Sequence, residues 1–554
     1  MVIKVLPVKS NSKMDEKDVL IYLLRDNWND FSFQTLYHLF LSAHHTENGE
    51  PLRFGEVKIL KKGQTEMDSI QLDVGDYQSL GRDFCSLGQS LDYYERIASL
   101  KENHKNTILT LLNDVIYQSE LKKEFEGEDG WKTSLMRGIK EDDDIFVLSP
   151  YLISKDYNSI PNLELKLSFC TGGMDSPVEF DFDAPSYGYA NHNKLPSRMN
   201  VIVGQNGSGK SSILSKISRV AFSSSKERRS ESLSSVGKIT PDGIGFPKII
   251  GISYSAFDSF QIPGVSIADK KQILSDMLSG KGRYVFCGIR DICQELSEYI
   301  LGFDEGNKLP DNDIIKDRVE NTKLKPIESM CEEITILFNL IVSKRRVSFL
   351  RDMVKLLSQE NSFREIESQL LDAIKSESLE DIFFSCSTGH KFVIHSLMNI
   401  IAHAEKRSLI LMDEPETHLH PPLLATFMTT IRVTLDKLDS FCIVATHSPI
   451  VVQETLSQHV HIMKRYGNKI DFFSPDIETY GENLSTITNL VFSLSGDYTQ
   501  FHKELDDIVT DYIFLNKDKD IKYIIDYIDT LFNHGLSMQA RSYVMSKIVS
   551  NLGQ

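Results

Sequence analysis

One short glycine-rich segment constrains this chain more than any other feature. Residues 204–211 read Gly-Gln-Asn-Gly-Ser-Gly-Lys-Ser and fit the pattern G-x-x-x-x-G-K-[ST] at every fixed position. The segment follows an apolar run, residues 199–203, and precedes a stretch in which Ile213, Leu214 and Ile217 recur at helical spacing. In that context glycines let the backbone wrap phosphate oxygens, and N–H groups at the helix N-terminus bind anions. The sequence therefore predicts a nucleotide-phosphate site at the end of a buried strand.

The side chains of this loop have distinct expected roles. We expect Lys210 to reach the β- and γ-phosphates of ATP, and Ser211 to ligate Mg²⁺. The other candidate cofactor-binding residues of the loop are Gly204, Asn206, Gly207, Ser208, Gly209 and Ser212. ATP and Mg²⁺ are the predicted cofactors.

A second apolar strand, residues 409–412, ends in two carboxylates. Asp413 and Glu414 follow it directly. Mg²⁺ keeps several waters and takes few protein ligands, so we expect Asp413 to meet the metal through water and Glu414 to polarise the attacking water. Gln261 is a further metal candidate, and Asp258 competes with it for that role.

A histidine follows the next predicted strand, residues 441–445. Because His447 lies one strand after the carboxylate pair, we assign it a catalytic role beside Glu414, as a partner of the γ-phosphate or of the attacking water. Strands that alternate with helices predict a largely parallel sheet covered on both faces. In such sheets ligands bind at the carboxyl ends of the strands, where these motifs lie.

A second candidate anion site opens an apolar helical stretch before the carboxylate strand. Residues 386–391 read Cys-Ser-Thr-Gly-His-Lys, and small residues at a helix start bind anions. ABC ATPases carry an L-S-G-G-Q signature at this point in the chain. Ser387, Gly389 and His390 stand in its Ser, second Gly and Gln places, with departures at Leu, the first Gly and Gln.

The phosphate loop, signature, carboxylate strand and histidine in this order resemble the ABC superfamily. Residues 413–421 resemble its branch of SMC, Rad50, RecF and OLD-type ATPases rather than transporter subunits. The resemblance implies an α/β fold: an ABC-type (SMC/RecF/OLD-like) P-loop ATPase head with helical insertions and accessory N- and C-terminal regions. It also implies a homodimer, with higher oligomers left open, in which Ser387 and Gly389 of one chain contact the γ-phosphate held by Lys210 of the other.

Four flanking segments resemble PtuA, the ATPase of Septu anti-phage systems, which also occurs in some retron operons. They are residues 55–60, 86–94, 253–258 and 478–483. This resemblance implies an ATP-hydrolysing regulatory or scaffold subunit of a defence complex that controls a PtuB-like HNH nuclease. In retron settings a reverse transcriptase with its msDNA or ncRNA would join it. The alternative is a RecF-like ATPase that binds DNA in repair or recombination, so a nucleic-acid partner stays open.

The chain shows no nuclease motif of its own. The late D-x-D at residues 518–520 lies among polar residues, and we interpret it as a solvated turn. We therefore expect an ATPase that is not itself a nuclease.

Composition narrows the partners and the compartment. A net charge of −17 argues against a surface covered by nucleic acid, although residues 226–229 and 344–346 form local basic clusters. No apolar run reaches the roughly 18 residues of a membrane span, and residues 1–7 have no signal-peptide pattern. We expect a cytoplasmic protein without membrane contact. The seven cysteines form no C-x-x-C pair, which favours reduced thiols.

The pattern along the chain predicts five parts. These are an accessory N-terminal region 1–160, a head N-lobe 161–264, a mostly helical insertion 265–385, a head C-lobe 386–495 and a helical C-terminal region 496–554. Locally, residues 19–24 and 107–112 predict buried helix faces, and residues 223–245, rich in Ser, Gly and charge, predict a loop. The sequence identifies no aromatic residue that would stack on adenine; Tyr187 and Tyr189 are merely near the loop.

Overall fold

The computed structural model describes residues 2–10, 12–162, 164–183, 195–304, 322–491, 500–515 and 521–552. The chain divides into two compact units, Met1–Glu482 and Asn483–Gln554. Tyr187, Tyr189 and residues 518–520 lie outside the described residues, and the five-part division stays a prediction. No described helix combines the length and the apolar character that crossing a bilayer requires.

The N-terminal part of the first unit is built on a six-stranded sheet of order β5-β1-β2-β3-β4-β6. Its strands are β1 (Val2–Leu6), β2 (Val19–Arg25), β3 (Leu36–Leu41), β4 (Leu52–Lys61), β5 (Gly75–Tyr77) and β6 (Phe84–Gly88). The helix predicted at residues 19–24 is wrong, because β2 occupies them. This strand is central and buried on both faces, so its continuous apolar run carries no period that separates strand from helix.

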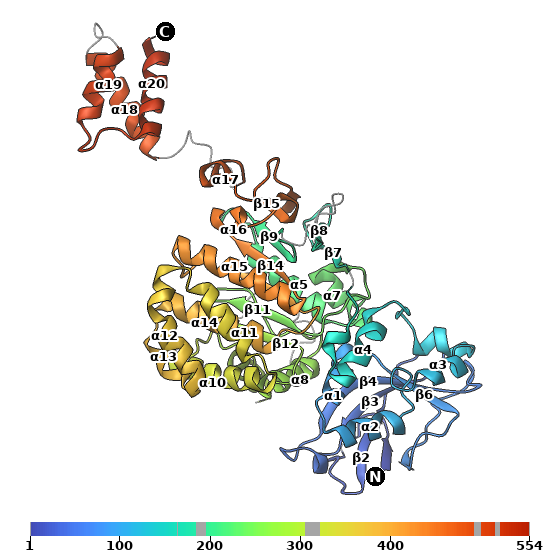
Figure 1. Ribbon diagram of the computed structural model, residues 1–554. Helices are drawn as coiled ribbons and strands as arrows, with labels where there is room; N and C mark the ends of the chain where they lie inside the picture. Colours follow the sequence, from blue (N-terminus) through green and yellow to red (C-terminus); the bar gives the residue numbers. More distant parts are fainter. Residues whose placement is uncertain are drawn as a thin grey trace, which may run out of the picture. The chain divides into compact units, whose positions relative to one another are not determined.

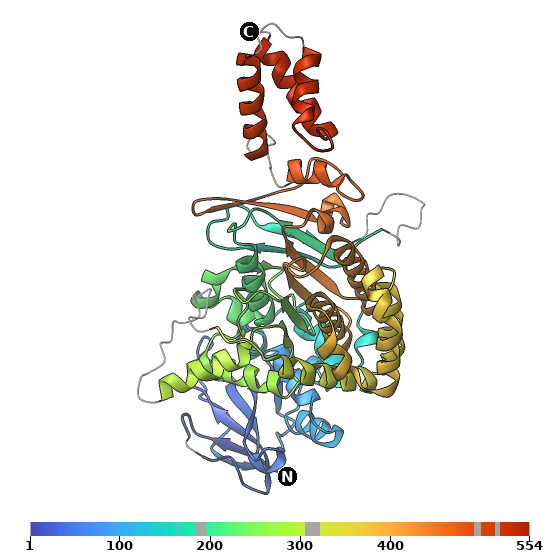
Figure 2. The ribbon, with the colours of Figure 1, turned by 90° about the vertical axis from the view of Figure 1, so that its left-hand side faces the viewer.

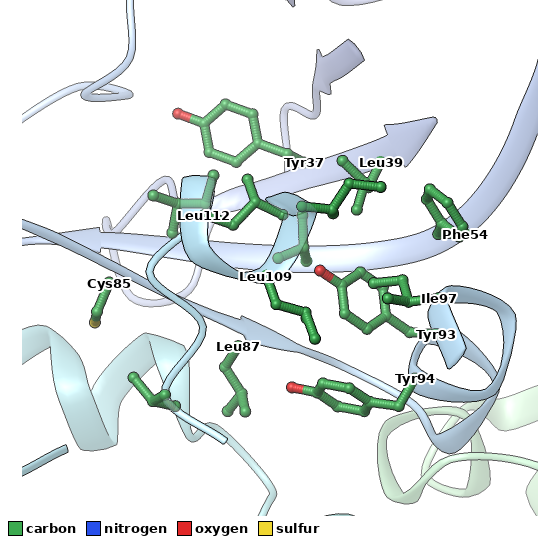
Figure 3. Close-up of a cluster of buried hydrophobic side chains, with 14 of the residues drawn as sticks. Tyr37, Leu39, Phe54, Cys85, Leu87, Tyr93, Tyr94, Ile97, Leu109 and Leu112 are labelled. Atoms are coloured by element: carbon green, nitrogen blue, oxygen red, sulfur yellow. The ribbon is translucent and has the colours of Figure 1, made fainter. Parts of the chain in front are cut away.

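Helices cover one face of this sheet and complete its core. They are α1 (Leu91–Ala98), α2 (Glu102–Leu111), α3 (Ser119–Phe125) and α4 (Asp144–Ser154), with short turns η1 (Ala43–His45), η2 (Trp131–Leu135) and η3 (Tyr157–Ser159). The helix predicted at 107–112 is confirmed in α2. Figure 3 shows Tyr93 and Tyr94 of α1 packed among side chains of the strands and of α2. Gly88 permits this packing, since a Cβ there would lie 2.2 Å from the Tyr93 ring.

The head of the same unit is built on a seven-stranded sheet of order β12-β11-β13-β14-β9-β15-β16. Its strands are β9 (Met199–Val203), β11 (Ile249–Ser253), β12 (Tyr284–Gly288), β13 (Leu409–Asp413), β14 (Phe441–Thr446), β15 (Val460–Tyr466) and β16 (Lys469–Phe473). Every neighbouring pair is parallel except β15–β16. The predicted parallel sheet is confirmed, and β14 lies between the phosphate-loop strand β9 and the carboxylate strand β13.

Helix α5 (Lys210–Phe222) packs on one face of this sheet, where Ile213 and Ile217 share a core with Leu409 and Leu411 of β13. A small antiparallel sheet of order β10-β7-β8 lies beside it: β10 (Lys238–Thr240), β7 (Lys166–Cys170) and β8 (Val178–Asp181). The loop predicted at residues 223–245 is wrong. Its serines cap short helices, with Ser224 and Glu227 in a capping box at α6 (Ser225–Arg228) and Ser230 at the start of α7 (Glu231–Val236).

The opposite face is covered by α14 (Thr388–His403) and α15 (Pro421–Leu438), which Figure 1 shows across the sheet from α5. The region 265–385 is mostly helical in its described residues and includes the strand β12. Its helices are α8 (Ile267–Leu278), α9 (Ile292–Asp304), α10 (Ile327–Ser343), α11 (Val347–Leu357), α12 (Asn361–Ser376) and α13 (Leu379–Ser385). In Figure 2 the yellow helices of this insertion flank the orange helix α15. The short helices α16 (Pro449–Gln453) and η5 (Ser457–His459) follow β14.

Buried ion pairs join the N-terminal sheet region to the head. Lys248 pairs with Glu95 at 2.6 Å, and Arg283 pairs with Asp92 at 2.7 Å. Arg407 donates to both oxygens of Asp144, at 2.8 and 3.2 Å. Each of these cations stands at the amino end of a strand of the seven-stranded sheet.

The second unit is helical over its described residues, as predicted for the C-terminal part of the chain. Its helices are α17 (Leu484–Val491), α18 (Gln500–Leu515), α19 (Ile521–Thr530) and α20 (Met538–Leu552). Leu505, Val509, Ile524, Ile528 and Val544 form a small core of its own.

Candidate nucleotide-binding site

The predicted phosphate loop connects β9 to α5 at the carboxyl edge of the sheet. Gly207 and Gly209 have φ values of 78° and 103°, which glycine adopts without strain. A Cβ on Gly204 would lie 2.4 Å from the carbonyl oxygen of Met463 in the neighbouring strand. The Ser208 hydroxyl is buried and has no hydrogen-bond partner among the described residues. A phosphate held by the loop would supply that missing acceptor, so the loop fits its predicted ligand.

Lys210 occupies the concave side of the loop. Its ammonium group donates to the carbonyl oxygens of Gly204 at 3.1 Å and Gln205 at 3.4 Å. Burial lowers the pKa of Lys210, and the carboxylates of Glu414 and Asp413 only partly offset this effect. Asn206 is exposed beside it, and Ser212 lies half-buried in the first turn of α5. A phosphate would give Lys210 a stronger acceptor than two carbonyl groups.

The two predicted metal ligands Ser211 and Asp413 lie side by side. The Ser211 hydroxyl donates to Asp413 Oδ1 at 3.1 Å, although the residues are far apart in sequence. Burial raises the pKa of Asp413 to about 7, and the carboxylates of Glu414 and Asp258 add to this effect. No cluster of three or more His, Cys, Asp or Glu side chains suited to a metal occurs in the part of the chain that the structure describes. A hydroxyl and one carboxylate fit Mg²⁺, which completes its coordination with phosphate oxygens and water.

The predicted catalytic pair Glu414 and His447 is joined to this group. His447 Nε2 lies 3.3 Å from Glu414 Oε1 and 2.7 Å from the Lys210 ammonium nitrogen. Glu414 has a φ of 46°, an uncommon left-handed value for a residue with a side chain, and its N–H donates to the Ala445 carbonyl of β14. The order β13-β14-β9 explains this meeting, because β14 brings His447 between the phosphate loop and the carboxylates.

Glu416 is a residue to which the sequence gave no role. Its carboxylate accepts hydrogen bonds from the Thr446 hydroxyl at 2.8 Å and from the His447 N–H at 2.5 Å. Burial raises the pKa of Glu416. It therefore fixes the backbone that presents the His447 ring.

The predicted signature residues form a separate group at the start of α14. Ser387 caps this helix by accepting from the His390 N–H at 3.3 Å. Gly389 packs against the loop after β13, since a Cβ there would lie 2.8 Å from the His418 carbonyl oxygen. Within the described residues, no hydrogen bond or ion pair joins Ser387, Gly389 or His390 to the phosphate loop of the same chain.

The assignment of Gln261 stays a prediction. The residue follows β11 in a loop whose Ser259 carbonyl accepts from Ser215 of α5 at 2.5 Å. Its competitor Asp258 is buried and pairs with Arg290 at 2.5 Å. Asp258 is therefore held by an arginine, while still close enough to Asp413 to raise the pKa of that carboxyl.

The two basic clusters are used within the chain. Lys226 pairs with Glu56 at 2.6 Å, and the buried Arg228 donates to backbone carbonyls. Lys344 and Arg346 both pair with Glu405. These contacts remove much of the charge that nucleic-acid phosphates would need.

Arg465 of β15 is a second residue that the sequence did not reveal. It is exposed, and its guanidinium lies 3.8 Å from the position of a Cβ on Gly209. Its neighbourhood follows from the pairing of β15 with β9, which no local pattern in the sequence encodes. An exposed cation thus stands beside the phosphate loop.

Comparisons with known proteins agree with the position of the motifs. A family model described as "AAA domain, putative AbiEii toxin, Type IV TA system" matches residues 343–453, which contain the signature, the carboxylate strand and His447. Protein ea59 of Escherichia phage lambda is 27% identical over 554 residues, covering 96% of this chain and 95% of that protein. Septu protein PtuA of Bacillus thuringiensis is 32% identical over 126 residues, covering 20% of this chain and 31% of that protein.

Two solved structures also match parts of the chain. MJ1267, an ATP-binding cassette of an ABC transporter, is 14% identical with a TM-score of 0.26, covering 60% of this chain and 97% of that one. The Smc head domain from Pyrococcus furiosus is 12% identical with a TM-score of 0.23, covering 56% and 95%. The chain carries a head with an ATPase-like P-loop fold. This α/β head rests on its own strand order and motif positions, with helical insertions and further N- and C-terminal regions around it.

Proposed function

We propose that this chain is a Mg²⁺-dependent ATPase that works as a homodimer with ATP between two heads. The observation that supports hydrolysis best is the meeting of Lys210, His447 and Glu414 beside the Ser211–Asp413 pair. Asp413, Glu414 and His447 lie at the ends of β13 and β14, and Lys210 and Ser211 begin α5 after the adjacent strand β9. Binding alone would not require a carboxylate and a histidine in contact at the γ-phosphate end of the loop.

Each residue has a defined task in this proposal. Bound Mg²⁺ would neutralise charge on the phosphate oxygens. Lys210 leaves the loop carbonyls for the phosphates, and Glu414 orients the attacking water and accepts its proton. His447, held through its backbone N–H by Glu416, supports Glu414 from one side and the γ-phosphate from the other.

The separation of the signature from the phosphate loop supports the dimer. Ser387 and Gly389 make no contact with the loop of their own chain among the described residues, so they are placed to serve a second copy. In that arrangement neither nucleotide site is complete in one chain.

Glu414→Gln tests hydrolysis directly. We expect steady-state turnover to fall at least about 100-fold while ATP binding persists and the dimer accumulates. Glu231→Gln, at an exposed position in α7, is the matched control and should hydrolyse ATP like the wild type. Unchanged turnover in Glu414→Gln would remove Glu414 from this role.

We further propose that the ATPase is a regulatory or scaffold subunit of an anti-phage defence complex that controls an HNH nuclease of the PtuB type. The local likeness to Septu protein PtuA supports this role, and so does a family description that names a toxin system. A retron setting with a reverse transcriptase and msDNA is a variant of the same proposal. The RecF-like alternative is weaker because the basic clusters that motivate it pair within the chain.

Purification of the tagged chain with ATP and Mg²⁺ from its native operon tests the partner. A co-purifying HNH protein is the expected result, and a reverse transcriptase with branched DNA would identify the retron variant. A bare homodimer whose hydrolysis is stimulated by DNA would instead support the RecF-like alternative.

A further inference from the structure

A buried carboxylate of the helical insertion lies beside the signature. Glu360 precedes α12, is 8% exposed, and its Oε2 accepts from the backbone N–H groups of Ser362 at 2.9 Å and Phe363 at 3.1 Å. The Ser362 hydroxyl also donates to Oε2, at 2.5 Å. Burial opposes ionisation, but these donors hold the pKa of Glu360 below its ordinary value. Glu360 is therefore an anion that caps α12.

The Ser362 hydroxyl connects Glu360 to the signature. It lies 3.0 Å from Nε2 of His390. Because its single proton goes to Glu360, Ser362 must accept from His390, which fixes the proton of that ring on Nε2. The Phe363 ring meets the His390 ring edge to face at 4.7 Å between centroids, so the imidazole is also held by packing.

The other oxygen of Glu360 faces a second histidine. Glu360 Oε1 lies 3.7 Å from Nε2 of His420, which ends the loop that begins with Glu414. His420 Nδ1 accepts from the Leu423 N–H at 3.1 Å and caps α15, so its proton also stands on Nε2. One carboxylate thus sets the tautomer of His390 through Ser362 and faces the Nε2–H of His420 on a different element.

These two elements are already in contact. Gly389 of the signature helix packs against the His418 carbonyl, in the loop that leads from Glu414 to His420. The cap of α12 contacts a residue of each element, His390 through Ser362 and His420 through Glu360. It therefore links the helical insertion to both.

We propose that Glu360 is a positioning residue for ATP hydrolysis, which orients His390 of the signature and His420 of the loop after the catalytic glutamate as one surface for the nucleotide of a second copy. This proposal rests on the ATP-bridged homodimer proposed above. Glu360 touches neither the phosphate loop nor the Ser211–Asp413 pair, so its removal leaves ATP binding within one chain intact. The loss of Glu360 should therefore slow ATP hydrolysis, the step that in this proposal needs both heads.

Glu360→Gln in the full-length chain tests it with little change in shape. The glutamine oxygen still accepts at the start of α12, but its NH₂ group turns a donor toward the Nε2–H of His420. We expect kcat to fall roughly tenfold while the KM for ATP changes less than about twofold, with a lower yield of dimer in the Glu414→Gln background. Glu367→Gln, a half-buried position on the same helix, should match the wild type.

A double-mutant cycle separates positioning from a general loss of structure. His420→Asn keeps a capping residue at α15 but loses the contact with Glu360. We expect the double variant to turn over no more slowly than the slower single variant, because both changes break one contact. Effects on kcat that multiply, or wild-type kcat in folded Glu360→Gln, would overturn the proposal.

Two further outcomes remain distinguishable. If Glu360→Gln does not fold, Ser362→Ala and His420→Asn test the two contacts one at a time, and wild-type kcat in both would refute the positioning role. If the wild-type chain shows no hydrolysis that depends on Glu414, the ATPase proposal itself fails, and this one with it.

Discussion

The two edges of the seven-stranded sheet differ in how their charged side chains are paired. At the amino edge Lys248, Arg283 and Arg407 stand just before three neighbouring strands, and each meets a carboxylate of the N-terminal region. At the carboxyl edge the carboxylates of Asp413 and Glu414 are neighbours in the sequence. The Lys210 ammonium contacts backbone carbonyls and, at 2.7 Å, a ring nitrogen of His447 rather than a carboxylate.

This difference separates an interface from a binding site. A buried charge is expensive unless it is paired, and the amino edge pairs each of the three cations within the chain. At the carboxyl edge burial raises the pKa of Asp413 to about 7 and lowers the pKa of Lys210, because neither charge has an ion-pair partner among the described residues. A phosphate and a divalent cation would satisfy both. The three cations of the amino edge are therefore paired when the chain folds, whereas Lys210 and Asp413 at the carboxyl edge would be paired when a ligand binds.

Breaking one pair at the amino edge should have the largest effect on stability. Arg407→Met leaves Asp144 buried without its partner, and loss of one member of such a pair costs about 3–5 kcal/mol of unfolding free energy. Urea denaturation followed by circular dichroism measures the loss. Arg345→Met is the matched control. Arg345 and Arg407 both have a left-handed backbone, with φ values of 58° and 69°, but Arg345 is exposed. Equal stability of both variants would mean that the amino edge is not held by its ion pairs.

The reverse change at the carboxyl edge should spare the apoprotein. Asp413→Asn removes a like charge beside Glu414, so we expect its melting temperature without nucleotide to equal or exceed that of the wild type. Mg-ATP at 100 times its Kd should stabilise the wild type by about 2.7 kcal/mol and the variant far less. EDTA should abolish most of the wild-type gain. A variant that is less stable without ligand would contradict the contrast between the two edges.

Much of the carboxyl edge was predictable because its signals are local. The phosphate loop is a contiguous pattern in which Gly207 and Gly209 take left-handed angles and Lys210 begins the helix. Asp413 and Glu414 directly follow a short apolar run, which the sequence predicted as a buried strand. The sequence alone thus predicted the head fold and the groups that the structure brings together.

The rest depends on contacts between distant segments. Nothing near Glu360 in the sequence indicates His390 or His420, and Arg465 reaches the phosphate loop only through the pairing of β15 with β9. The strand at residues 19–24 was misread as a helix because a fully buried strand in a mixed sheet has no polar face to give a period of two. The amino-edge ion pairs were invisible because each joins residues more than 150 positions apart.

Away from the nucleotide site, the carboxyl edge also contains ionic groups that the chain does pair, such as Asp258 with Arg290 and His395 with Glu333. His395 of α14 lies 3.0 Å from Glu333, which Lys325 contacts at 2.5 Å, and next to Cys287 of β12. Burial alone would lower the pKa of His395, but Cys287 and Glu333 outweigh it and raise the pKa to about 9. This value exceeds the ordinary one of about 6.5.

Because the folded pKa is raised, protonation of His395 stabilises the fold fully below about pH 6.5, and this stability is lost as the pH rises through about 9. His395→Gln lacks this titration. The difference in unfolding free energy between wild type and variant should therefore narrow from pH 6 to pH 9.5 on the basis of that shift. His44→Gln, the same substitution at an exposed position, is the control and should change the free energy of unfolding little. A difference that widens with pH would show that His395 is not protonated in the folded state.

The smallest expected effect belongs to Arg465, the exposed cation beside Gly209. A phosphate bound at the carboxyl edge should attract this guanidinium. Arg465→Ala should therefore weaken ATP binding roughly fivefold, equivalent to about 1 kcal/mol. Because the group is exposed, the loss should shrink in high salt. Lys469→Ala, an exposed cation on the same hairpin that pairs with Asp175, is the control and should bind ATP normally. Titration of a fluorescent ATP analogue at two salt concentrations decides the matter. A loss of ATP affinity that does not depend on salt would show that Arg465 acts by packing around the loop. Lys210 would then be the cation of this edge that attracts phosphate.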